Sequence, residues 1–211
     1  MTKLETVIAK YGMHDLNPIV RRVKTFADVL TFGKAFLNNK LYRSVDYFAM
    51  FGKGRDTAGH DQERERLLQL HDLRCYTTCG QINVKDANIE QRSYVTFYCE
   101  RDTADRLLPA LEARDDIFYV MSSNHDSTFC NFASDCVNVT KVKQEDGTWR
   151  FCTNIWRTHG YIGVLTYDSD DEIGYHAEWN RVFQDLVLVD VAVKEYGYHT
   201  ESAEIVLEML K

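Results

Sequence analysis

The sequence predicts an α+β fold, with a mixed or antiparallel sheet of about five strands and a helical N-terminal third packed on it. Three observations carry this prediction. Helix-capping signatures recur through residues 1–72. The pattern then changes, and residues 93–121 read as strand, helix and strand. Two alternating segments around an Asp-Gly turn predict a β-hairpin over residues 136–156, which we expect to join the same sheet.

The helices of the first third are predicted from their ends. Thr2 with Glu5, and again Thr25 with Asp28, form the capping-box pattern that starts a helix. Between them, Asn17-Pro18 places an N-cap residue before a proline at the first helical position. Further helices are expected over residues 42–51 and over the charged segment 61–72, the second of them exposed to solvent.

The sheet is predicted to be built around a βαβ unit. Residues 93–100 alternate with aromatic side chains on both faces, which indicates an interior strand. A helix capped by Asp102 or Thr103 follows, and Pro109 should kink or shorten it. With a strand over residues 117–121, this order predicts a ferredoxin-like βαβ element at the centre of the fold.

The C-terminal part leaves one alternative open. A strand is predicted over residues 161–167, and Thr200 is predicted to cap a short final helix. Apolar residues across 175–193 recur at helical spacing, which favours an amphipathic helix, and homodimerisation through this helix is a related hypothesis. The valine-rich stretch 187–193 is equally typical of a strand.

Composition predicts a single globular domain in the cytoplasm. A chain of 211 residues buries roughly 70% of the surface that it exposes when unfolded, so its core needs neither disulfide nor metal. No apolar run approaches the ~20 residues of a membrane-spanning helix, and the N-terminus lacks the order of a signal peptide. We therefore expect free thiols, no cofactor, no bound metal and no membrane association.

One aromatic strand resembles part of a known RNA-binding family. Residues 93–97, Ser-Tyr-Val-Thr-Phe, resemble the second half of the strand signature of the RNA recognition motif, with Ser93 where that family has glycine. The resemblance implies rings that stack on bases, and two rings on one face would be Tyr94 and Tyr98. The net charge of −7 disfavours broad binding to phosphate and therefore disfavours nucleic acid as a partner, so RNA binding is the second alternative function.

A polar loop after the 117–121 strand supplies the first alternative, which is catalysis. His125 beside Asp126 has the chemistry of a general base, and Ser127 or Cys130 that of a nucleophile. Loops that follow strands carry functional groups disproportionately. These residues predict a hydrolase or transferase.

The preferred hypothesis is a stand-alone interaction protein, a regulator or inhibitor that binds a macromolecular partner, most simply another protein. Trp149 and Trp156 lie at the two ends of the second hairpin strand. Tryptophan and tyrosine are enriched at protein interfaces. The sequence therefore predicts that these two tryptophans contribute to a binding surface.

Overall fold

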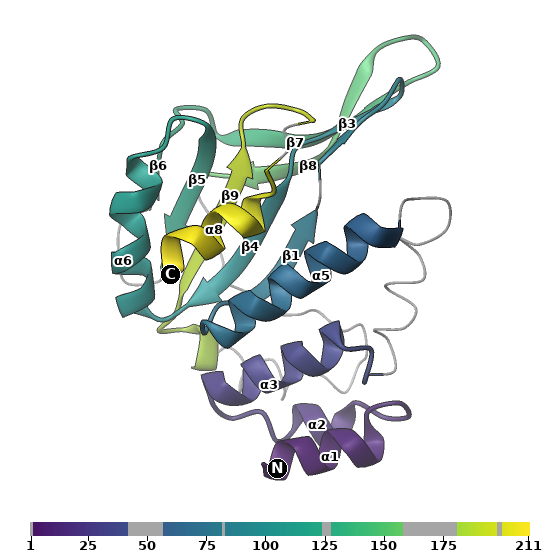
Figure 1. Ribbon diagram of the computed structural model, residues 1–211, viewed down its shortest axis with the longest axis vertical. Coiled ribbons are helices and arrows are strands. Elements are labelled where there is room, and N and C mark those ends of the chain that lie inside the picture. Colours follow the sequence, from purple (N-terminus) through teal and green to yellow (C-terminus); the bar gives the residue numbers. More distant parts are fainter. Residues whose placement is uncertain (1, 42–56, 82, 124–127, 158–180, 198–199) are drawn as a thin grey trace. The chain divides into compact units, whose positions relative to one another are not determined.

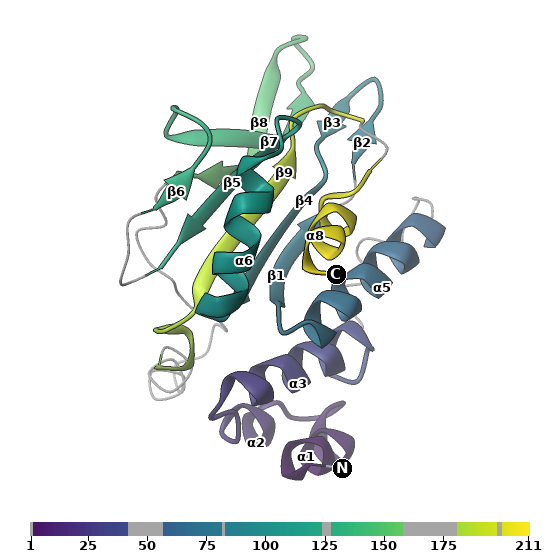
Figure 2. The same cartoon turned by 60° about the vertical axis from the view of Figure 1, so that its left-hand side comes forward.

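The computed structural model describes residues 2–41, 57–81, 83–123, 128–157, 181–197 and 200–211 (Figures 1 and 2). Over these residues the chain has the predicted α+β fold, with two β-sheets. It divides into two compact units, Met1–Tyr76 with Ile162–Gln184 and Thr77–Tyr161 with Asp185–Lys211. The first boundary lies close to the predicted change of pattern at residue 73.

The first unit is helical. Its helices are α1 (Lys3–Tyr11), α2 (Asn17–Val20), α3 (Phe26–Leu37) and α5 (Thr57–Asp72). Helix α1 packs against α2 and α3, and α3 packs against α5. Both predicted capping boxes are present, since Thr2 and Thr25 accept the backbone N–H of Glu5 and Asp28 respectively. Local capping chemistry thus starts these helices at the predicted residues.

Two details of the first unit differ from prediction. Helix α2 begins at Asn17 itself, with Leu16 as its N-cap, because the Asn17 N–H is already bonded to the Asp15 carboxylate. Helix α5 is not simply exposed, since it buries Leu70 and His71. The predicted 42–51 helix lies outside the described residues.

The second unit contains a five-stranded sheet. Its strands are β1 (Tyr76–Gln81), β4 (Tyr94–Cys99), β9 (Val187–Val193), β5 (Ile117–Ser122) and β6 (Phe129–Cys130), in that order. Because β9 is antiparallel to both β4 and β5, the latter two are parallel with β9 between them. Helix α6 (Arg101–Glu112) connects them, which gives a split βαβ arrangement. The ferredoxin-like classification of this unit stays a prediction.

Residues 187–193 form a strand, so the helical alternative for them is wrong. Every residue of β9 is buried, since neighbouring strands flank it on both sides and its faces are covered. β-Branched valines suit such a site. A homodimer that uses a continuous 175–193 helix is therefore not available, although residues 175–180 lie outside the described residues.

Helices α6 and α8 (Ser202–Leu210) cover the same face of the five-stranded sheet (Figure 1). The N-cap of α6 is Glu100 rather than Asp102 or Thr103, and that of α8 is Glu201 rather than Thr200. Pro109 does not end α6, which continues to Glu112. The proline lies on the exposed side of the last turn, where water can satisfy the carbonyl that loses its donor.

The predicted hairpin is present but belongs to a sheet of its own. Strands β7 (Cys136–Lys143) and β8 (Trp149–Trp156) pair antiparallel, and Gly147 adopts φ +83° in the turn. With β2 (Val84–Lys85) and β3 (Ile89–Gln91) they form a four-stranded sheet in the order β2-β3-β7-β8. This corrects the prediction that the hairpin joins the five-stranded sheet. The predicted 161–167 strand lies outside the described residues.

The two sheets share a hydrophobic cluster. Tyr94, Val120 and Ala192 come from the five-stranded sheet, and Val139 and Ile155 come from the four-stranded sheet. By strand alternation these residues lie on the face opposite the helices. The second unit is therefore layered, with helices on one face of the larger sheet and the smaller sheet on the other.

Candidate functional site

The predicted catalytic residues His125, Asp126 and Ser127 lie outside the described residues. The strand that leads to them ends at Ser122, whose Oγ is buried and has no hydrogen-bond partner in the described part of the chain. Next to it, Ser123 Oγ accepts a hydrogen bond from Arg101 Nη2 at 3.1 Å. These contacts place no base or nucleophile, so catalysis at this loop stays a prediction.

Tyr94 and Tyr98, the predicted stacking pair, are both buried. Their exposed fractions are 4% and 6%, and Tyr94 belongs to the cluster between the sheets. Burial, with a smaller effect of the Asp190 carboxylate, raises the pKa of Tyr98 to about 12. Neither ring presents a face on which a base could stack, and we therefore do not carry the RNA-binding alternative forward.

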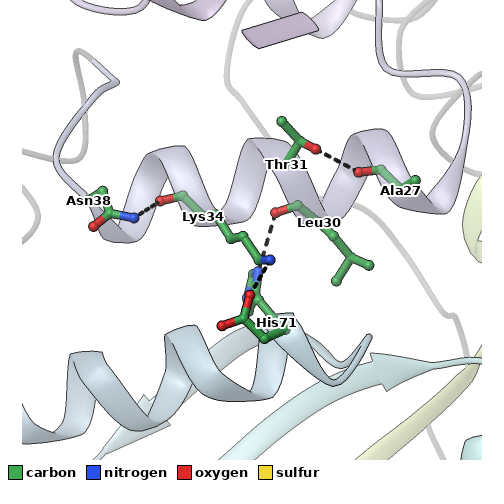
Figure 3. Close-up of polar contacts among 7 residues, drawn as sticks. Ala27, Leu30, Thr31, Lys34, Asn38 and His71 are labelled. Carbon is green, nitrogen blue, oxygen red and sulfur yellow. Dashed lines mark hydrogen bonds and ion pairs between the residues drawn. The ribbon is translucent and has the colours of Figure 1, made fainter. Parts of the chain in front are cut away.

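His71, in the first unit, is buried as the neutral imidazole. Burial lowers its pKa to about 4, and its Nδ1 lies 3.5 Å from the carbonyl oxygen of Leu30 (Figure 3). Its ring packs 5.4 Å from that of Tyr76 and lies directly over Gly33, where a Cβ would be 2.2 Å from the imidazole. A ring so enclosed reaches no substrate, and we assign it a structural role.

The two predicted tryptophans differ in exposure. Trp149 is half-buried, with Lys141 Nζ 4.7 Å from the ring centroid. Trp156, at the other end of β8, is 51% exposed. Phe151, between them on the same strand, is also 51% exposed, and sequence analysis did not identify it.

Trp149 ends a stack in which cations and aromatic rings alternate, here named the cation–aromatic ladder. Its members, in order, are Lys194, Phe118, Arg92, Tyr196, Lys141 and Trp149. Each cation lies between 4.3 and 5.4 Å from the centroids of its neighbouring rings. Such contacts contribute roughly 0.5–1 kcal/mol each at exposed sites and more where water is excluded. The ladder therefore ties the hairpin to the five-stranded sheet.

Arg92 is the central member of the ladder because it also bonds to the backbone of β7. Its Nη1 donates to the Asn138 carbonyl at 2.7 Å, and its backbone N–H donates to the Val139 carbonyl at 2.8 Å. The register of β7 and β8 shifts here, as in a β-bulge, so successive carbonyls turn towards Arg92. Burial lowers the pKa of Arg92, but a guanidinium stays protonated in proteins.

Strand β8 lies at the edge of its sheet. Among the described strands it pairs with β7 alone. Thr153 pairs with Thr140 and Phe151 pairs with Lys141, which leaves Cys152 opposite no residue of β7. This second irregularity gives the outer edge of β8 a local bend, with Phe151, Cys152 and Trp156 all exposed.

The hairpin is positively charged in a negatively charged chain. Residues 136–157 contain four basic and two acidic side chains, whereas the chain as a whole carries −7. Lys143 and Arg150 are exposed and form no ion pair within the described part of the chain. The acidic pair, Glu145 and Asp146, lies in the turn, and Asp146 is held there by the Thr148 N–H at 2.9 Å.

The fold and the surface thus define an α+β protein with a basic hairpin whose edge strand exposes aromatic side chains. No protein-family model matches the chain, and no curated protein matches it in sequence. Within the described ranges, no three His, Cys, Asp or Glu side chains gather as a metal site would require. None of the helices described is long and apolar enough to cross a bilayer.

Proposed function

We propose that this protein is a stand-alone interaction protein that binds another protein through the edge of β8. The observation that carries the proposal is the exposure of Phe151 and Trp156, each 51%, on a strand with an unpaired outer edge among the described residues. Exposed aromatic residues on a free strand edge are a hazard for aggregation unless they serve an interface. A regulator or inhibitor would act by covering the partner's own functional surface.

The cation–aromatic ladder supports the proposal because it holds the surface in place before a partner binds. Lys141 and Trp149 fix one end of the hairpin, and Ile155 fixes the other end in the core between the sheets. A rigid binding surface loses less conformational entropy on association. A cytoplasmic location is part of the same proposal, and the free thiols of Cys75, Cys130, Cys136 and Cys152 suit a reducing compartment.

Affinity capture from the source cell with matched variants tests this function. We expect Phe151→Ser and Trp156→Ala to retain the fold and to lose proteins that the wild type captures. Met13→Ala is the control, since Met13 is also a large exposed hydrophobic residue but belongs to the first unit. If the captured set is the same for all four proteins, β8 is not the binding surface.

A further inference from the structure

We infer that the partner contributes an extended, acidic peptide segment that pairs with β8 as an additional strand of the four-stranded sheet. This inference rests on the proposed function and adds the chemistry of the partner to it. Three features of β8 lead to it: a backbone edge that pairs with none of the described strands, the bend at Cys152 and the local positive charge.

The backbone edge selects a polypeptide in extended conformation. Strand β8 has eight residues, and its inner edge is occupied by β7. Its outer edge offers alternating N–H and C=O groups over a length of about 26 Å, at 3.3 Å per residue. Another strand matches this repeat along its whole length, which is the basis of recognition by strand addition. A helix or a nucleic acid does not match this repeat of backbone hydrogen-bonding groups.

The bend at Cys152 makes the edge selective. Because Cys152 has no opposite residue on β7, β8 bends between Phe151 and Thr153, and its outer row of hydrogen-bonding groups follows the bend. Such an irregularity discourages a flat, unrelated strand from adding to the sheet. A partner strand must follow the bend, and it can then place apolar side chains beside Phe151 and Trp156.

Charge distinguishes the two polypeptides that could pair with β8, which are a second copy of this chain and an acidic segment of another protein. A second copy of this chain would bring an identical hairpin against this one, and residues 136–157 of each copy contain four basic and two acidic side chains. Symmetric antiparallel pairing of two β8 strands would bring Arg150 of one copy towards Arg157 of the other, and these like charges oppose association. An acidic segment instead gains from the same two exposed cations. The full chain, at −7, still repels most acidic proteins, which confines the attraction to the hairpin.

Selection from a displayed library of random ten-residue peptides on the full-length protein tests the inference. We expect selected peptides to alternate Asp or Glu with apolar residues and to lack proline. Synthetic copies should lose at least tenfold in affinity when alternate backbone amides are N-methylated, and their affinity should fall as salt rises from about 0.05 M to about 0.3 M. Arg150→Glu should weaken binding severalfold, whereas Lys3→Glu, at an exposed position of the first unit, should not.

The outcomes separate this inference from the function on which it rests. Basic or proline-rich selected peptides, no selected peptide at all, or affinity that survives both N-methylation and Arg150→Glu would overturn strand addition by an acidic segment. If protein capture still depends on Phe151 and Trp156 in that case, the interaction function stands with a different partner chemistry. If capture does not depend on them, the proposed function itself is wrong.

Discussion

His71 is held neutral by its surroundings. It is 1% exposed and packs against Gly33 and the ring of Tyr76, while the nearby ion pair of Lys34 and Asp72 contributes opposing and smaller effects. Burial without a compensating charge disfavours the imidazolium. The site therefore links proton binding to the stability of the first unit.

Acidification should destabilise the protein through His71. Its pKa is about 4 when folded and 6.5 ordinarily, so between these values the unfolded chain binds more protons. The contribution of neutral His71 to the free energy of unfolding is complete above pH 6.5. It is lost as the pH falls towards 4, by about 3 kcal/mol in total. Urea unfolding at a series of pH values measures this loss.

Variants are needed to assign this pH dependence to His71. His71→Gln should be less stable than the wild type at pH 7, and the difference between them should shrink as the pH falls to 4. His14→Gln is the control, because His14 is exposed and belongs to the same unit. If the wild type and His71→Gln lose stability in parallel, His71 is not the group responsible.

At the scale of elements, α8 is anchored by two serines rather than by its predicted cap. The Ser202 N–H donates to Ser93 Oγ at 2.7 Å, and Ser202 Oγ donates to the Ser93 carbonyl at 2.8 Å. Both side chains are fully buried. Because the two residues lie 109 positions apart, Ser93 fixes the start of α8 against the entrance to β4.

Ser93→Ala should reduce the free energy of unfolding by about 1–3 kcal/mol, because it leaves the buried Ser202 N–H without its acceptor. Hydrogen exchange should increase most in the first turn of α8. Ser134→Ala, at an exposed serine, should change stability by less than about 0.5 kcal/mol. Equal effects of the two substitutions would show that the Ser93 contact does not anchor the helix.

Elements formed by interactions between residues close in sequence were predicted correctly, whereas those decided by residues far apart in sequence were not. The helices begun by Thr2 and Thr25 were predicted because their caps lie within three residues. Residues 187–193 were ambiguous because valines at helical spacing also suit a strand, and only the flanking strands β4 and β5 decide the outcome. The Asp-Gly turn of the hairpin was predicted correctly, but this local pattern did not reveal that the hairpin belongs to a second sheet.

The candidate site was less predictable than the elements. Alternation placed Tyr94 and Tyr98 on one face of a strand, but it could not show that other elements cover that face. Trp156 was identified by residue type, whereas the exposure of Phe151 depends on which part of β8 the rest of the fold leaves uncovered. The cation–aromatic ladder joins residues from 92 to 196 in sequence, and no local pattern signals such contacts.

At the scale of the whole second unit, the two sheets are joined by an apolar cluster and by the ladder. The cluster lies between their faces, around Val139 and Ile155. The ladder lies along one end, where Arg92 leads into β4 and its guanidinium reaches the carbonyl of Asn138 on β7. Loss of the ladder should therefore loosen the hairpin without unfolding the five-stranded sheet.

Arg92→Met tests this division. Methionine retains much of the apolar volume but removes the 2.7 Å hydrogen bond to Asn138 and the cation beside Phe118 and Tyr196. We expect backbone amides of β7 and β8 to exchange at least tenfold faster, which corresponds to about 1.4 kcal/mol, while those of β9 keep their protection. Hydrogen exchange measured by mass spectrometry resolves these strands.

Arg106→Met is the matched control for Arg92→Met, since Arg106 is exposed on α6 in the same unit and its Nε donates to the Asp102 carbonyl, at 3.4 Å. This control should leave exchange in both sheets unchanged. Because the ladder positions the proposed binding edge, Arg92→Met should also weaken partner capture, even though Arg92 is not on β8. Faster exchange throughout β4, β5 and β9 would contradict a local role and make Arg92 a determinant of the entire unit.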